Sequence, residues 1–166
     1  MIVSNTTPIS NLLHLNRIEI LQHLFKKIHI PPAVKQELEV TFSAHSKWRQ
    51  CLKNEFFIIR NIKNPLLIRQ LRLQLHPGEA EALCVCMENK ADLCLLDDKD
   101  ARVIAGLNKI PVTGTLGILI QAKNKGMLDS VKYSMDELKN CHHFWISNAM
   151  YKKVLELSGE KSMDSS

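Results

Sequence analysis

Five polar residues spread along the chain have the types needed to bind a divalent cation. Asn5 and the pair Asp97-Asp98 each follow a short apolar run, and Glu37 and Glu79 lie in segments with helical patterns. Two adjacent carboxylates at the end of an apolar strand repel one another, and a bound cation best explains that pairing. Because all five residues offer oxygen atoms, the expected ion is Mg²⁺ or Mn²⁺.

The four acidic residues also have simpler roles. Glu37 lies two residues before another glutamate, as on a solvated helix face. Glu79 in a first helical turn would complement the helix dipole by ~0.3–1 kcal/mol. Asp97-Asp98 would cap a helix that starts near Asp100. Taken singly, the simpler roles are favoured; taken together, the residues favour a metal site.

The elements that must position these residues alternate between strand and helix. A parallel sheet forms sites where the chain leaves the carboxyl ends of its strands, and Asn5 and Asp97-Asp98 stand at two such exits. The alternation therefore predicts an α/β domain around a mainly parallel sheet. Strands are expected at Met1–Ser4, Ile28–Ile30, Leu93–Leu96 and Ile110–Val112, and Phe144–Ile146 is a further candidate. Phe56–Ile59 fits either a strand or the end of the preceding helix.

Helices fill the remaining segments. A helix that starts at Thr7-Pro8 carries apolar residues at helical spacing as far as Phe25, and another follows Pro31-Pro32. The stretch Thr41–Asn54 fits either a helix or a loop. Further helices are expected at Pro65–Leu75, Glu79–Asn89, Asp100–Leu107, Leu116–Asn124, Ser134–Asn140 and Asn148–Leu157.

Length and composition fit one globular domain. The chain has 166 residues, 45% of them hydrophobic, and a net charge of +5 that suits a polyanionic partner, although the basic residues are scattered. Residues 1–158 are expected to form the domain, and 159–166 a disordered tail. With no signal peptide and no apolar run long enough for a membrane span, the expected location is the cytoplasm.

The five cysteines and the histidine cluster do not predict a zinc site. An odd number of cysteines without an export signal favours reduced thiols. Cys84 and Cys86 would point to different sides of one helix, so they are expected to be buried apolar residues, as is Cys94 on a strand. Cys141-His142-His143 lacks a second spaced pair of ligands and fits a surface turn.

Five segments lie in order between Met1 and Lys125: Ile2–Ile9, Pro31–Leu38, Gly78–Ala82, Leu95–Arg102 and Val112–Gly117. Together they resemble the PIN-domain family, and specifically the VapC-like toxin branch of prokaryotic toxin–antitoxin systems. The resemblance implies a compact three-layer α/β/α sandwich with a parallel sheet, whose acidic cluster binds Mg²⁺ or Mn²⁺ and cleaves RNA.

The resemblance also implies a role for each polar residue. Asn5 stands where the first aspartate of the family usually does, Glu37 matches the second acid, Glu79 the third and Asp98 the fourth. Asp97 would be an auxiliary ligand.

Three further residues are weighed as helpers. Glu81 is a less favoured third acid, because a helical projection places it on the polar side of its helix. Thr6 and Thr115 would use their hydroxyls to hold water, metal or phosphate.

The asparagine at position 5 departs from the family pattern. It keeps an oxygen ligand but removes a negative charge, so the site should hold metal more weakly. Two interpretations follow. Glu37, Glu79, Asp97 and Asp98 suffice for a working ribonuclease, or the domain binds nucleic acid or an antitoxin without efficient cleavage. A phosphoacceptor domain is a third hypothesis, supported only by Asp97-Asp98.

The family resemblance extends to partners. It implies an RNA substrate, a small antitoxin protein and a homodimer. The apolar segments Leu12–Phe25 and Leu66–Leu75 are candidate contact surfaces, and they fit the core equally well.

Overall fold

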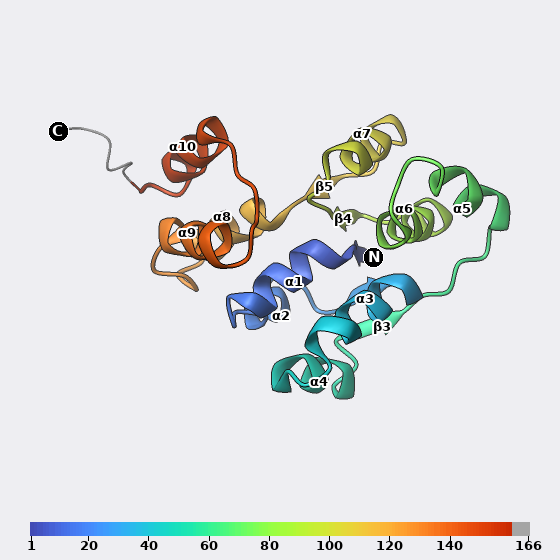
Figure 1. Ribbon diagram of the computed structural model, residues 1–166, viewed down its shortest axis with the longest axis horizontal. Helices are drawn as coiled ribbons and strands as arrows, with labels where there is room; N and C mark the ends of the chain where they lie inside the picture. The colour runs from blue at the N-terminus through green and yellow to red at the C-terminus, as the bar shows by residue number, and fades with distance from the viewer. Residues whose placement is uncertain (161–166) are drawn as a thin grey trace.

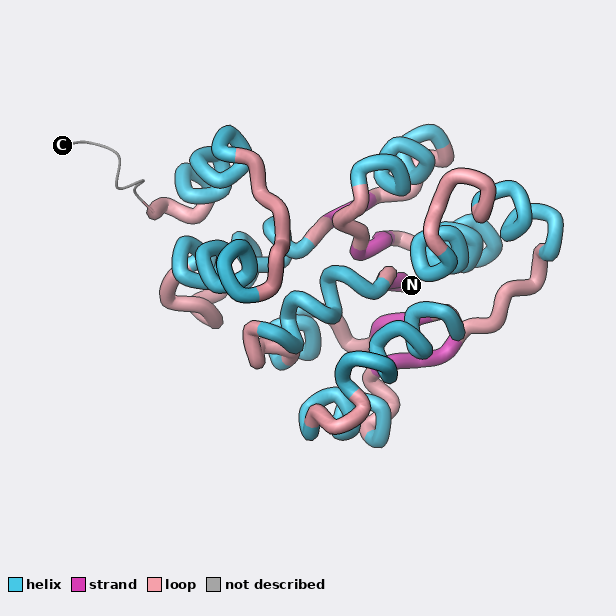
Figure 2. Tube along the Cα trace, viewed as in Figure 1, coloured by secondary structure: helices cyan, strands magenta, loops and turns pink. Residues whose placement is uncertain are grey.

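A computed structural model describes residues 1–160, whose centre is a parallel five-stranded sheet. The strand order is β3-β2-β1-β4-β5, and every neighbouring pair is parallel. The strands, magenta in Figure 2, are short. They are β1 (Ile2–Ser4), β2 (Ile28–Ile30), β3 (Phe57–Ile59), β4 (Leu93–Leu95) and β5 (Val112–Thr113).

Helices connect the strands and continue past the last of them, as Figure 1 shows. Prolines at the starts of α3, α5 and α6 fit the first helical turn, where a missing N–H costs nothing. The helices within residues 1–160 are α1 (Thr6–His14), α2 (Glu19–Leu24), α3 (Pro32–Phe42), α4 (Ser46–Lys53), α5 (Pro65–Leu71), α6 (Pro77–Asn89), α7 (Lys99–Leu107), α8 (Thr115–Asn124), α9 (Val131–Cys141) and α10 (Asn148–Leu157).

The sheet lies between two helical layers. Successive side chains of a strand point to opposite faces, so β4 contributes to two cores. Leu95 packs into the cluster that holds the apolar faces of α1 and α8, whereas Cys94 and Leu96 pack into the cluster formed with α6 and α7. In Figure 1, α1 and α7 lie on opposite sides of β4. The predicted three-layer α/β/α sandwich is confirmed.

The first predicted helix is in fact two helices. Asn16 has a positive φ of 55° and turns the chain after α1. The backbone N–H of Arg17 donates to the Leu12 carbonyl at 2.7 Å and closes that turn. The break folds α2 back, so that Ile18 and Leu21 are buried together with Leu12. A straight helix would have carried these apolar side chains away from the sheet.

The structure decides the secondary structure of two segments that the sequence left ambiguous. Thr41–Asn54 contains the end of α3 and the whole of α4, and Phe57–Ile59 is a strand. The candidate strand Phe144–Ile146 is wrong, because these residues form the loop between α9 and α10.

The two segments predicted as contact surfaces differ in burial. Leu12 and Leu21 are completely buried, so most of Leu12–Phe25 belongs to the core. In the segment Leu66–Leu75, the side chains of Leu66 and Leu73 are 72% and 81% exposed. Only this second segment offers apolar side chains at the surface.

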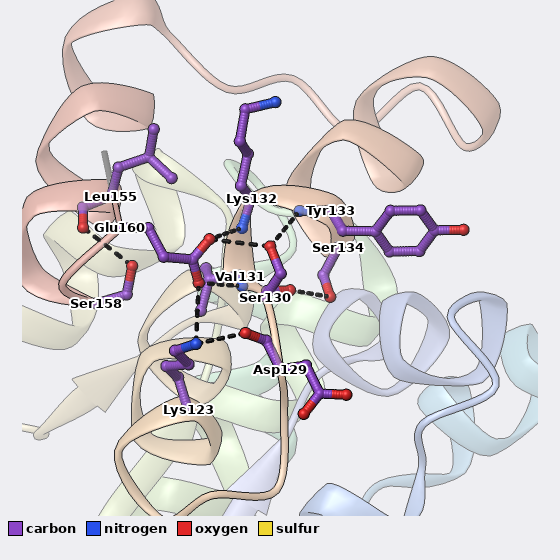
Figure 3. A network of polar contacts seen from close by, with 10 residues as sticks. All are labelled: Lys123, Asp129, Ser130, Val131, Lys132, Tyr133, Ser134, Leu155, Ser158 and Glu160. Carbon is purple, nitrogen blue, oxygen red and sulfur yellow. Dashed lines mark hydrogen bonds and ion pairs between the residues drawn. The ribbon is translucent and has the colours of Figure 1, made fainter. Parts of the chain in front are cut away.

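Part of the predicted tail is held in place. The Glu160 carboxylate accepts hydrogen bonds from the backbone N–H groups of Val131 at 2.6 Å and Lys132 at 3.0 Å, and from the Ser130 hydroxyl at 2.9 Å (Figure 3). The Lys123 ammonium lies 3.7 Å from it. Glu160, which the prediction places in the tail, is therefore bound at the start of α9, and residues 161–166 lie outside the described part of the chain.

The cysteines predicted to be buried are buried, whereas Cys141, predicted to lie in a surface turn, is the exposed last residue of α9. All five are free, and Cys84, Cys86 and Cys94 are buried. Within residues 1–160 no helix has the length and apolar character needed to cross a membrane.

Candidate active site

The candidate site lies at the carboxyl ends of β1 and β4, the two central strands. From β1 the chain continues toward β2 and β3, whereas from β4 it continues toward β5 on the other side. Such a reversal in strand order leaves a crevice in which ligands bind. Asn5 follows β1 directly, and Asp97-Asp98 follow β4, so the fold brings these predicted residues to one edge.

Asn5 is the most buried of the predicted ligands, with 2% of its surface exposed. Its backbone N–H donates to the Leu95 carbonyl at 3.0 Å, which joins the end of β1 to β4. Its side-chain oxygen, Oδ1, is buried and accepts no hydrogen bond from the described residues. Buried polar atoms are nearly always paired, so this oxygen is an available ligand atom.

Glu37 reaches the site from α3. Its carboxylate accepts hydrogen bonds from the Thr6 hydroxyl and, at 3.2 Å, from the Gly78 backbone N–H. A Cβ atom on residue 78 would lie 2.8 Å from both carboxylate oxygens. Glycine is therefore required before Glu79, because any side chain at position 78 would collide with the Glu37 carboxylate. The predicted helper Thr6 orients Glu37.

Glu79 lies at the start of α6, where its carboxylate accepts a hydrogen bond from the His76 backbone N–H at 3.3 Å. Burial raises the pKa of Glu79, and the negative charges of Asp98 and, less strongly, Glu37 raise it further, against the hydrogen bond from His76. Glu79 thus lies close enough to Asp98 and Glu37 to be affected by the negative charge of each. A cation placed among them would offset that charge.

Asp98 caps α7, because its Oδ1 accepts the backbone N–H of Ala101 at 2.8 Å. The simpler role foreseen for this residue is real, and it coexists with the electrostatic contact to Glu79. The cap fixes the carboxylate at the helix N-terminus, where the helix dipole favours negative charge.

Asp97 is turned toward α8 instead. Its Oδ1 accepts the Thr115 backbone N–H at 2.8 Å and its Oδ2 accepts the Thr115 hydroxyl at 2.6 Å. Burial raises the pKa of Asp97, although the Thr115 hydrogen bonds and the Arg102 charge oppose the shift. Asp97 therefore anchors the start of α8, and its role as an auxiliary metal ligand stays a prediction.

Asn11 was missed by the sequence reasoning. Its Nδ2 donates to the Thr115 hydroxyl oxygen at 3.0 Å, and it is 5% exposed. Asn11, Thr115 and Asp97 therefore form a buried polar chain that ties α1 to α8 and β4. A signal was present, because an asparagine beside Leu12 and Leu13 interrupts an otherwise apolar helix face.

The prediction that Glu81 lies on a polar helix face is wrong. The residue is 8% exposed. Its carboxylate accepts the Ala33 backbone N–H at 2.9 Å and pairs with the Arg72 guanidinium at 2.6 Å. The helical projection failed because α3 packs over this side of α6. Both oxygens of Glu81 thus bind protein groups that join α6 to α3 and to Arg72, and Glu79 stays the predicted third acid.

A groove of about 910 Å³ opens beside the acids. Glu79, Asp97 and Asp98 line one side, and residues of α1, α7, β5, α8, α10 and the loop before α10 line the rest. The groove thus connects the acidic edge of the sheet with a largely apolar surface contributed by the C-terminal helices.

The residues present fit an oxygen-preferring divalent cation. The unpaired Asn5 oxygen is a suitable ligand atom, and a cation would offset the negative charge that Asp98 and Glu37 place on Glu79. Among residues 1–160, no three acidic, histidine or cysteine side chains are gathered as a ready-made metal site. The acids are held by protein donors, so binding an ion would require some of them to turn.

Comparison with known proteins gives one match. The model of a family, DUF3368, described as a PIN domain, matches residues 1–160. No curated protein and no solved structure matches the chain significantly.

Proposed function

Because the chain belongs to the PIN-domain family, a family of nuclease-type folds, we propose that it is a metal-dependent ribonuclease that hydrolyses RNA phosphodiester bonds. The observation that carries the proposal is the unpaired oxygen of Asn5 at the sheet edge where Asp98 also lies, with Glu79 close enough to be affected by the charges of Asp98 and Glu37. These four residues would hold Mg²⁺ or Mn²⁺.

The residues of the site would have separate roles in holding the metal ion, the start of α8 and the RNA. When bound, the cation would lower the pKa of water and offset charge on the phosphate. Asp98 accepts a hydrogen bond at the N-terminus of α7 and Glu37 accepts one from Thr6, so both carboxylates are kept at the site, from which they would turn to an ion. Asp97 and Thr115 keep the start of α8 against the site. Lys99 and Arg102, which line the groove, would hold the RNA backbone.

The biological role we propose is that of the toxin in a toxin–antitoxin pair, acting in the cytoplasm as a homodimer. The apolar groove beside the acids supports a small antitoxin as partner. The exposed Leu66 and Leu73 support a contact between two copies. The molar mass in solution, alone and with the product of a neighbouring small gene, tests both partners.

A second candidate function is a catalytically weakened module that binds RNA or an antitoxin without efficient cleavage. Asn5 favours it, because the amide brings an oxygen to the site without a charge.

Cleavage assays with Mn²⁺ separate the two functions. We expect the wild-type protein to cut RNA, and Asp98→Asn to lower the rate by about a hundredfold or more. Asparagine is also a good helix cap, so this variant should keep α7 intact. Asp100→Asn, a change in the next acid along α7, should cut like the wild type. If the wild type cuts none of several RNAs with Mn²⁺ or Mg²⁺, the binding module is the correct function.

A further inference from the structure

Trp145 is unusual among the large side chains. It lies in the loop between α9 and α10 and is 83% exposed, whereas the other tryptophan, Trp48, is completely buried. Tryptophan is rarely left in water, because its ring buries more apolar area than any other side chain and so dominates binding energetics. Loops held by a rigid scaffold commonly carry binding residues.

The position of Trp145 connects it to the acids. It lines the same groove as Glu79 and Asp98, and it also lines a second hollow of about 470 Å³ with Lys139 and His143. Its loop rises between α9 and α10 on the side turned toward β5 and α7 in Figure 1. The indole therefore stands between two hollows, one of which leads to the acidic edge of the sheet.

The groove also carries positive charge. Lys99 and Arg102 come from α7 and Lys153 from α10, and all three are exposed. A chain that passes from the acids to Trp145 would meet cations on both of its sides. This arrangement is complementary to a polyanion that also presents flat apolar rings, which describes a nucleic-acid strand with unpaired bases.

Resting on the proposed ribonuclease function, we propose that Trp145 stacks on an unpaired base and positions single-stranded RNA along the groove. Every base has a π-face, so stacking selects single strands without selecting a sequence. In a duplex the bases are already stacked on one another and are not offered to a side chain. Trp145 is thus a substrate-positioning residue that favours loops and unpaired ends.

Binding is tested on the full chain with EDTA present, so that cleavage plays no part. The probe is a labelled oligoadenylate of roughly ten nucleotides, a length within the range of single-strand sites. We expect Trp145→Ala to weaken its binding about tenfold in fluorescence anisotropy, and Trp145→Phe to weaken it less. Tyr133→Ala is the matched control, because Tyr133 is 70% exposed but lines neither hollow.

Fluorescence gives an independent measurement. In a Trp48→Phe background, Trp145 is the only tryptophan, and oligoadenylate should quench its emission. An abasic ribose-phosphate strand of equal length should leave the emission unchanged. If the Trp48 variant does not fold, the anisotropy series in the native background decides alone.

The outcomes separate this inference from the nuclease function. If Trp145→Ala binds oligoadenylate as tightly as the wild type, the inference is overturned whether or not RNA is cut. If the wild type fails to cut RNA but loses tenfold in binding on Trp145→Ala, the stacking role holds and the nuclease function fails. If an acidic amphipathic peptide shifts the Trp145 emission and RNA does not, the groove is a protein-docking surface and the inference is wrong.

Discussion

Asn5 brings an oxygen atom to the site without bringing a charge. Its side-chain oxygen is buried and unpaired, and the negative charges of Asp98 and Glu37 already raise the pKa of Glu79 at the same site. A carboxylate in its place would bring two oxygens and a fourth negative charge. Without a cation that charge is unfavourable, because a buried ion without a partner loses its hydration.

We therefore expect Asn5→Asp to have opposite effects with and without metal. The metal-free variant should be less stable than the wild type by at least about 1 kcal/mol. With Mn²⁺ it should gain stability, bind the ion about tenfold more tightly and cut RNA faster, since ligand charge sets affinity. Thermal melts with and without Mn²⁺, together with calorimetric titration, measure these effects. A variant that Mn²⁺ stabilises no more than the wild type would remove Asn5 from the metal site.

At the scale of elements, glycines control how closely helices approach the acids. Gly114 precedes α8, with an extended φ of −114° that any residue adopts, so its backbone does not require glycine. The available space does require glycine, because a Cβ atom at position 114 would collide with Asp97 Oδ1 and lie 3.0 Å from Arg102 Nη1. The same principle keeps Gly78 beside Glu37.

Gly114→Ala is accordingly expected to lower the free energy of unfolding by about 1–3 kcal/mol, as overpacking does. Urea denaturation measures this change. Gly106→Ala is the matched control, since nothing lies within 4 Å of a Cβ at that position of α7. The control should gain roughly 0.5–1 kcal/mol from helix propensity. Equal stability of the two variants would show that Asp97 is free to move away from α8.

At the scale of the whole molecule, the end of the described chain closes the fold. Glu160 follows α10 and binds the N-terminus of α9, while Lys123 at the end of α8 pairs with it. Burial alone would raise the pKa of Glu160, but hydrogen bonds from Lys132, Val131 and Ser130 and the charge of Lys123 outweigh it and lower the pKa. The last three helices are therefore joined through one carboxylate.

Glu160→Gln should cost about 1–2 kcal/mol of stability at pH 7, because it weakens charge-assisted hydrogen bonds at a helix N-terminus. The lowered pKa sets the pH dependence. The contribution is complete above the ordinary value of 4.5 and disappears as the pH falls through the lower folded-state value. Urea unfolding of both proteins across that range measures it. A difference that stays constant with pH would mean that the charge of Glu160 does not contribute.

The sequence alone determined the parts of this protein that depend on local pattern. The apolar run Leu93–Leu96, the prolines before helices and the order of strand and helix led to the parallel sheet and its two layers. The polar residues at strand exits led to Asn5 and Asp98, because every parallel strand ends at the same edge.

Tertiary structure decided what depends on packing between distant segments. Periodicity predicted Glu81 on a polar helix face, but α3 packs over that face. The single helix predicted over Leu12–Phe25 is two helices, because Asn16 turns the chain. Asp97 and Asp98 are adjacent in sequence, yet one anchors α8 and the other approaches Glu79. Periodicity reports which side of an element is apolar, whereas the partner of a buried polar atom depends on which other element comes to lie beside it.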